Sequence, residues 1–248
     1  MSELKTITIP WVTNPSKNNS VTPKTTQRYF QFSIFSDRKC EKLSGIYYYL
    51  LDTCIRNGDR LVKSDYVMGS EIVLPESKET ISRLTYYSTA DCSEQIGDEI
   101  EYRLPYEQCF DSYQGSARVT IVSSLPIRPP VTNDADRVTA LRLFKTRGDC
   151  SFGGVEHELA FLVQEKCIPG GGRQPDMTFL ECSKSMISGF RYDSQNGTCS
   201  GNFVEWSHTY REVCASPNIH LDSTFAGYPH WTCYGLGPDR PRSSSLLI

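Results

Sequence analysis

The fold is decided by a stretch that recurs along the chain, most clearly in residues 86–109, YYSTADCSEQIGDEIEYRLPYEQC. An aromatic, strand-like run enters a short polar turn and reaches Cys92. A second strand-like run follows and ends at Cys109. Short strands separated by turn residues are typical of all-β proteins, so we compare the rest of the chain with this unit.

Three further copies of the unit align with it, and they are Tyr29–Cys54, Ala140–Cys167 and Gly189–Cys214. Each copy carries a polar pair just before its first cysteine. These pairs are Asp37-Arg38, Ala90-Asp91, Gly148-Asp149 and Asn196-Gly197. Such residues supply a positive φ or an Asx turn at little steric cost. The sequence therefore predicts four strand pairs, each bounded by two cysteines.

The units also group by two, because residues 27–125 align loosely with residues 138–236 in cysteine order, turn chemistry and strand spacing. We interpret this as an internal duplication. The predicted fold is all-β, with two related antiparallel β-sandwich-like modules stapled by disulfides. The predicted parts are an N-terminal arm (1–26), a first β module (27–125), a linker (126–137), a second β module (138–236) and a C-terminal tail (237–248). The modules either follow one another as beads or pack as one continuous sandwich.

Neither module has a window with the apolar spacing of an amphipathic helix. The nearest to one is Val155–Lys166, but its centre, Leu159–Val163, is a contiguous apolar run. A run of this kind is more typical of a strand buried on both faces. Between the modules, the linker contains prolines with polar neighbours, which stiffen and extend a connection.

The 248 residues include ten cysteines, and we expect all of them to form disulfides. They are Cys40, Cys54, Cys92, Cys109, Cys150, Cys167, Cys182, Cys199, Cys214 and Cys233. Cys182 and Cys233 stand outside the repeated unit, where the first module has apolar runs, so we expect these two to bridge each other.

The pairing of the other cysteines stays open. In a plain hairpin, the two cysteines of one unit would be about 20 Å apart, whereas a disulfide needs Cα atoms about 4.4–6.8 Å apart. A bridge within a unit therefore requires the intervening segment to loop back. The alternative is that bridges connect neighbouring units, and the sequence does not choose among on the order of 900 pairings.

Disulfides favour an extracellular or particle-associated location. The sequons at Asn18 and Asn196 agree with glycosylation in such a location. No signal peptide is visible, because Met1–Thr6 does not lead into an apolar h-region. Three explanations stay open: a leader removed before this sequence begins, export by another route, or a particle oxidised after the producing cell dies.

The charge and hydropathy of the chain limit the kinds of partner that it is expected to bind. The net charge is −3 with both signs spread along the chain, and no basic block favours nucleic acid. No apolar run approaches the length of a membrane span. The main expected partner is a second copy of the chain, in a homo-oligomer or lattice, and a carbohydrate or protein ligand is the alternative.

No catalytic site, cofactor or metal is expected. The chain has no G-x-S-x-G elbow, and a cysteine nucleophile would need a free thiolate. His157 lies between two glutamates, but we expect a solvated charge cluster in a polar loop. His208, His220 and His230 lie near Cys214 and Cys233 and are candidate zinc ligands. Because Cys214 closes a repeat, we interpret it as a disulfide partner instead.

Aromatic residues offer a candidate surface. Tyr47-Tyr-Tyr49 places tyrosines on both faces of a strand, and the face outside the core suits a sugar or a protein. Trp206, Tyr210, Tyr228 and Trp231 could add to such a surface in the second module. Core packing is the simpler interpretation for most of them.

The N-terminal arm offers a candidate assembly contact. Ile7, Ile9 and Trp11 alternate with polar residues, the period of an edge strand, and Pro10 also suits an edge. An arm of this kind either lies against its own domain or docks on a neighbouring subunit.

The function predicted first is a non-enzymatic, disulfide-stabilised structural protein that self-associates, as a coat, capsid-associated, matrix or crystalline-body component. The alternative is a secreted binding module, lectin-like or inhibitor-like, that uses tyrosine-rich surfaces. A third hypothesis is a hydrolase whose residues meet only in three dimensions, with His157 or His220 against a carboxylate and a hydroxyl.

Overall fold

A computed structural model describes residues 27–57, 64–112, 115–130, 137–168, 175–183, 186–194, 197–209, 214, 218–219 and 226–235. The predicted arm, the predicted tail and residues 131–136 of the predicted linker lie outside these ranges. The described chain consists mostly of antiparallel strands, as the sequence predicts.

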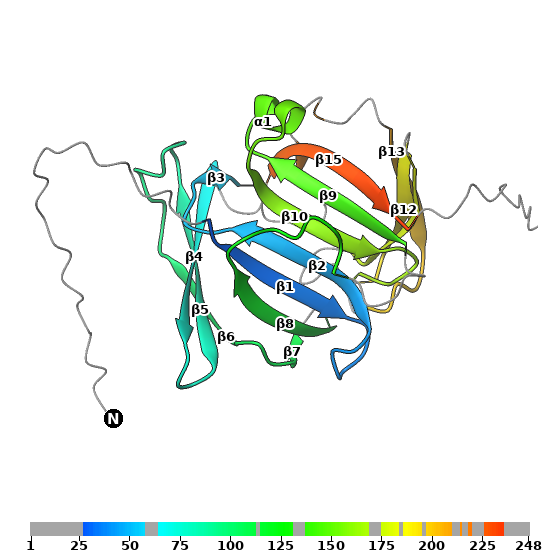
Figure 1. Ribbon diagram of the computed structural model, residues 1–248, viewed down its shortest axis with the longest axis horizontal. Helices are drawn as coiled ribbons and strands as arrows, with labels where there is room; N and C mark the ends of the chain where they lie inside the picture. Colours follow the sequence, from blue (N-terminus) through cyan, green and yellow to red (C-terminus); the bar gives the residue numbers. More distant parts are fainter. Residues whose placement is uncertain are drawn as a thin grey trace, which may run out of the picture.

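A central sheet of eight strands runs through the middle of the molecule (Figure 1). In spatial order its strands are β14 (Asn218–Ile219), β15 (Ala226–Tyr234), β9 (Val138–Phe144), β10 (Glu156–Val163), β2 (Leu43–Leu50), β1 (Tyr29–Phe35), β8 (Gly115–Val122) and β7 (Phe110–Ser112). Because β2 pairs with β10, residues of both predicted modules share one continuous sheet.

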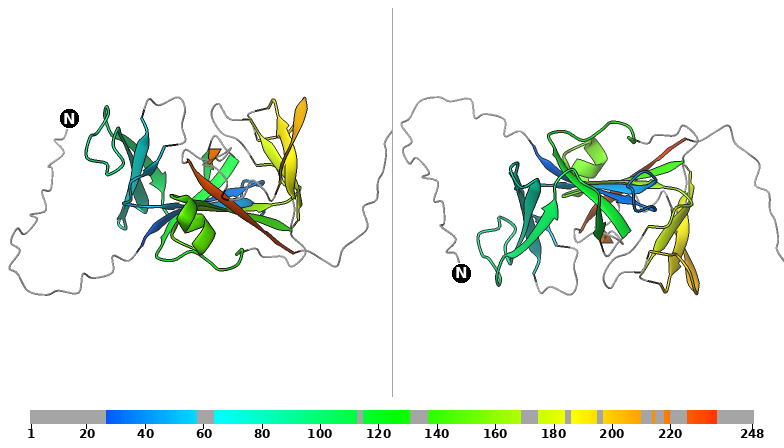
Figure 2. Two further views of the ribbon diagram at one scale, coloured as in Figure 1. Left: turned by 90° about the horizontal axis from the view of Figure 1, so that it is seen from above. Right: turned by 90° about the horizontal axis from the view of Figure 1, so that it is seen from below.

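Two smaller sheets stand at opposite ends of the central sheet and rise on the same side of it (Figure 2). The first side sheet contains β3 (Ile55–Arg56), β4 (Tyr66–Leu74), β5 (Glu79–Tyr87) and β6 (Ile100–Pro105). The second side sheet contains β11 (Met177–Cys182), β12 (Met186–Tyr192) and β13 (Phe203–Thr209). Along the chain, each side sheet is inserted between the second strand of its half, β2 or β10, and the last long strand, β8 or β15.

The strand order of the central sheet is the same from either edge. One half contributes β2, β1, β8 and β7 outward from the middle, and the other contributes β10, β9, β15 and β14. The register between β2 and β10 agrees with this arrangement, because residues at matching positions of the two strands are related symmetrically. Tyr47 and Ala160, each the fifth residue of its strand, lie opposite each other, with Tyr49 opposite Glu158 on one side and Gly45 opposite Leu162 on the other.

The core lies on both faces of the central sheet. On one face, Tyr47 and Leu162 pack against Phe179 and Ile187 of the second side sheet. Tyr48, Leu159, Phe161 and their neighbours form a separate cluster on the opposite face. The run Leu159–Val163 is therefore buried on both faces, as its sequence predicts.

A short helix, α1 (Arg147–Phe152), connects β9 to β10 and was not expected from the sequence. The Thr146 side chain caps it by accepting a hydrogen bond from the Asp149 N–H at 3.0 Å. Gly153 ends it with a left-handed φ of 72°, which glycine adopts without steric penalty. At the corresponding place after β1, Asp37 forms the predicted Asx-type turn by accepting from Lys39 N–H at 3.2 Å, and it also accepts from Lys42 N–H at 2.6 Å.

All ten cysteines form disulfides, as predicted. The bridges are Cys40–Cys109, Cys54–Cys92, Cys150–Cys214, Cys167–Cys199 and Cys182–Cys233. Four of them connect neighbouring repeat units, so the between-unit alternative is the one the fold adopts. The fifth confirms the predicted bridge between the two cysteines outside the unit. Every bridge closes within one half of the chain.

Candidate interaction surface

The residues proposed for zinc do not form a site in the described part of the chain. Cys214 and Cys233 are bonded to other cysteines, so neither has a thiolate to offer. His230 is half-buried on β15, where burial and then the charge of Arg142 lower its pKa. His208 belongs to β13, and His220 lies outside the described residues.

One group in the described residues has the spacing of metal ligands, namely Cys167, Asp176 and Cys199. The two sulfurs are bonded to each other. The buried Asp176 carboxylate accepts a hydrogen bond from the Ser194 hydroxyl at 2.7 Å and from the Gly197 N–H at 2.9 Å. Asp176 therefore anchors the turn between β12 and β13, because its carboxylate already accepts hydrogen bonds from that turn.

His157 differs most from its predicted environment. The sequence predicts a solvated loop, but His157 lies in β10 with 1% of its surface exposed. It is the extra residue of a bulge, since Glu156 pairs with Phe144 and Glu158 with Leu143. Burial, with a contribution from Lys145, lowers the pKa of His157 to about 4. The prediction of a solvated cluster is wrong, and a neutral, enclosed imidazole does not meet an external substrate.

The buried Glu71 on β4 is also structural. Its carboxylate accepts a hydrogen bond from the Thr80 hydroxyl at 2.7 Å. Burial raises the pKa of this carboxyl, and hydrogen bonds from Ser82 and Thr80 oppose that rise. This carboxyl group therefore lies on the buried side of the first side sheet and not at an accessible surface.

The predicted tyrosine surface is mostly core. Tyr47 and Tyr48 are each 2% exposed, so both faces of their strand are buried. Trp231 is buried as well, and Trp206 packs edge-on against Phe179 with ring centroids 5.0 Å apart. Core packing, the simpler interpretation of these residues, is confirmed for them. Tyr210 lies outside the described residues.

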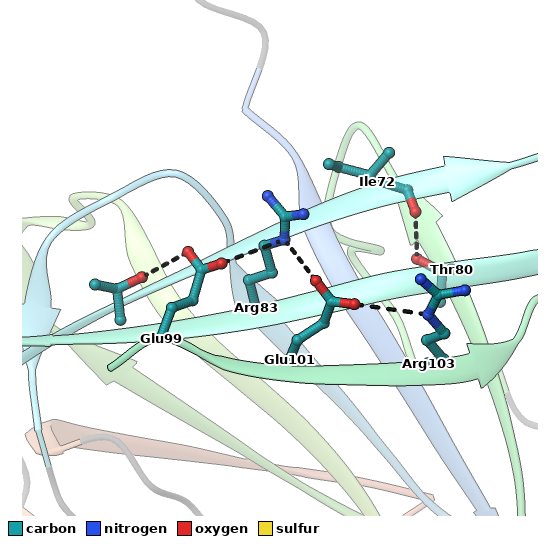
Figure 3. A network of polar contacts seen from close by, with 7 residues as sticks. Ile72, Thr80, Arg83, Glu99, Glu101 and Arg103 are labelled. Carbon is teal, nitrogen blue, oxygen red and sulfur yellow. Dashed lines mark hydrogen bonds and ion pairs between the residues drawn. The ribbon is translucent and has the colours of Figure 1, made fainter. Parts of the chain in front are cut away.

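The outward face of the first side sheet is charged (Figure 3). Arg83 on β5 contacts Glu99 at 3.4 Å and Glu101 at 3.3 Å, and Arg103 contacts Glu101 at 3.6 Å. These side chains lie on the face of the sheet that points away from Leu84, and Leu84 packs in one cluster with Tyr49 of the central sheet. A row of partly exposed charges thus follows β6, the outer strand of this sheet.

The outward face of the second side sheet is aromatic instead. Phe190 and Tyr192 of β12 and Phe203 of β13 form a group that we call the aromatic cluster. The Phe190 and Phe203 ring centroids are 4.5 Å apart, and Tyr192 lies 6.0 Å from Phe203. Phe203 is 56% exposed, and its neighbour Val204 on the other face of β13 is 69% exposed. Large apolar side chains therefore flank both faces of one strand.

That strand lies at an open edge. Among the described strands, β13 pairs only with β12 over its seven residues. The other edges are less available: β14, β3 and β7 are two or three residues long, and β11 is tied to the chain after β10 by an Ile168–Met177 bridge. Edge strands are usually blunted by charges or by shortness, as β6 is, whereas β13 carries only Glu205.

The sequence did not mark this edge. The sequence predicts a strand in the second part of the Gly189–Cys214 unit, but whether a strand is an edge depends on which neighbours the topology gives it. The alternation of Phe203 and Glu205 with Val204 and Trp206 was the available signal. The proposed arm residues Ile7, Ile9 and Trp11, and the sequon asparagines Asn18 and Asn196, lie outside the described residues.

Comparisons with protein-family models, with curated proteins and with solved structures find no match to this chain. Within the described residues, no helix is long and apolar enough to cross a membrane.

Proposed function

We propose that this chain is a non-enzymatic structural protein that self-associates into a durable extracellular or particle-bound assembly. The observation that carries the proposal is the exposed β13 edge, long and flanked by apolar side chains on both faces. An edge of this kind pairs readily with another chain. A non-enzymatic role is consistent with the burial of His157 and Glu71, two ionisable groups of the core whose pKa values are shifted by that burial.

The disulfides support the setting of the assembly. Five bridges leave no free thiol among the ten cysteines, and such density is typical of proteins in oxidising compartments. Each bridge typically stabilises a fold by about 2–4 kcal/mol. That stabilisation suits a coat, matrix or crystalline-body component that persists outside a cell.

We also infer that the two halves descend from one duplicated module. The matching strand order on both sides of the β2–β10 pair supports this. The matching bridges support it too, since Cys40–Cys109 and Cys150–Cys214 both tie the first connection of a half to the start of its last strands. Disulfide mapping of native protein checks the inference, because a bridge between the halves would contradict it.

The aromatic cluster gives a reason to keep one alternative, a secreted binding module. Exposed rings can stack on a sugar or a protein partner. In that case the chain would be a monomer at all concentrations and would bind its ligand saturably. A self-associating protein would show a concentration-dependent size in the absence of any ligand.

Sedimentation velocity across a wide concentration range tests the proposal. The wild-type chain is expected to form oligomers, and a chain lacking residues 1–14 is expected to remain folded but to associate more weakly. Denaturation without reductant, followed by alkylation and intact mass, should show no labelled cysteine in either protein. A wild-type chain that stays monomeric throughout, or that carries several free thiols, would make the proposal wrong.

A further inference from the structure

The acceptor for the N-terminal arm follows from comparing the outer strands of the two side sheets. β6 and β13 occupy the same place, each being the last strand of its sheet. β6 carries Glu101 and Arg103, held in the charged network of Figure 3. Such charges oppose the approach of a further strand. β13 has no equivalent network among the described residues, so it is the edge open to pairing.

The chain contains a segment suited to that edge. Residues 5–12, KTITIPWV, alternate polar and apolar side chains with Ile7, Ile9 and Trp11 on one side. Pro10 lacks an N–H, which suits an outermost strand that receives no further partner. Residues 1–26 contain three lysines and one glutamate, so the single charge of β13, Glu205, does not repel them.

The position of the arm indicates where it goes. Gln27 and Arg28 directly follow the arm, and Arg28 forms an ion pair with Asp52 at 2.6 Å. The N–H of Asp52 donates to the Gly69 carbonyl of β4 at 2.8 Å, so the first described residues lie beside the first side sheet. Figure 1 shows β13 at the opposite end of the molecule. Residues 13–26 can span up to about 45 Å when extended, enough to reach a neighbouring molecule.

We propose that residues 5–12 of one copy pair as an added strand along the free edge of β13 in a second copy. The apolar side of the arm then covers the aromatic cluster. The donor and the acceptor lie at opposite ends, so the contact is heterologous and repeats head to tail. The expected product is an open chain of subunits whose length grows with concentration, and not a closed dimer. This inference rests on the proposed function and adds the contact that would carry it.

A complementation experiment tests the contact. The first variant lacks residues 1–14 and can only accept an arm. The second, Phe203→Lys with Val204→Lys, can only donate one, because charges flank both faces of its β13 edge. Each variant alone is expected to sediment as a monomer at concentrations where the wild type is oligomeric. An equimolar mixture is expected to form heterodimers that grow no further, since neither chain has both partners of the contact.

Controls keep structural damage apart from loss of the contact. Phe152→Lys removes an aromatic residue that is more exposed than Phe203, 91% against 56%, and should assemble like the wild type. All variants should show no free thiol after denaturation without reductant. As a second measurement, a labelled peptide of residues 3–14 should bind the chain lacking residues 1–14. Its affinity should fall at least tenfold when the two lysines are added and should not change with Phe152→Lys.

The outcomes separate this inference from the proposed function. If the double-lysine variant assembles like the wild type while the shortened chain is monomeric, the arm docks elsewhere and the β13 assignment is wrong. If both variants assemble, another contact such as the C-terminal tail joins the subunits, and the inference is wrong although self-association stands. If the wild type is a fixed dimer, the head-to-tail arrangement is wrong. A wild-type monomer overturns both proposals.

Discussion

The two halves of the central sheet follow the same path but differ in what they bury and what they expose. Their long bridges span similar lengths of chain, 69 residues for Cys40–Cys109 and 64 for Cys150–Cys214. Their sulfurs even lie against corresponding carbonyls, with Cys40 Sγ 3.5 Å from Ala117 O and Cys150 Sγ 3.6 Å from Pro229 O. The cross-links and strand register are therefore the shared part of the design.

The differences lie in side chains at matched positions. The hairpin of each half has a bulge, and its extra residue is Ser44 in one half and His157 in the other. Ile121, opposite Phe30, holds the register position that Cys233 holds opposite Thr139. The outward faces of the side sheets differ most, as one is charged and the other aromatic. The framework of strands and bridges therefore constrains the chain path, while the outward faces of the side sheets vary independently of it.

The largest effect is expected from removing matched disulfides. Cys54–Cys92 closes 38 residues and Cys167–Cys199 closes 32. Because the restriction of the unfolded chain depends only weakly on loop length, each double Cys→Ala variant should lose about 4 kcal/mol of unfolding free energy. Denaturant titration of both variants measures the two losses. Losses that differ by more than about 2 kcal/mol would show that the halves are not energetically equivalent.

The class of the fold was predictable because local residue patterns determine it. The contiguous run Leu159–Val163 indicated a doubly buried strand, and the placement of Cys182 and Cys233 indicated their bridge. Helix α1 was missed although Thr146, Asp149 and Gly153 form a cap signature, because six residues contain no apolar periodicity. Local patterns specify strands and caps but not which strands become neighbours.

The shared sheet and the candidate site therefore could not be predicted. The β2–β10 pairing joins strands from different halves, and the residues of neither strand specify which strand will be its neighbour. His157 looked solvated because its sequence neighbours are glutamates, whereas the bulge that buries it exists only once β9 and β10 are paired. The β13 edge is likewise a consequence of sheet order.

The next largest effect on the unfolding free energy comes from His157, in the bulge of the second half, and it depends on pH. Burial holds the pKa of His157 at about 4 in the folded chain, against about 6.5 when unfolded. Between these values the unfolded chain binds more protons, so stability is complete above pH 6.5 and falls as the pH drops toward 4. The loss approaches about 3 kcal/mol. Unfolding titrations at several pH values should show this slope in the wild type.

The matched variant for this prediction is His157→Ser, which places the residue of the first half in the second. Its unfolding free energy should lack the His157 contribution to the slope, whatever its absolute stability. Ser44→Ala, at the matching bulge, should keep the wild-type slope. The raised pKa of Glu71 has the opposite sign, since the folded state holds that proton more tightly, and it is common to all three proteins. An unchanged slope in His157→Ser would show that His157 is not the group responsible.

The smallest effect compares one glycine from each side sheet. A Cβ on Gly189 of β12 would overlap the Thr178 carbonyl oxygen and lie 2.8 Å from Trp206 Cζ2. A Cβ on Gly69 of β4 would meet nothing closer than 3.6 Å, at Leu84. Gly189→Ala should therefore lower the unfolding free energy by about 1–3 kcal/mol through overpacking, whereas Gly69→Ala should change it by less than about 1 kcal/mol. Equal losses in denaturant titrations would mean that β11 and β12 can separate to admit the methyl group. In that case the position of β13 and its edge would not depend on the close approach of β11 and β12, which places Trp206 against Phe179.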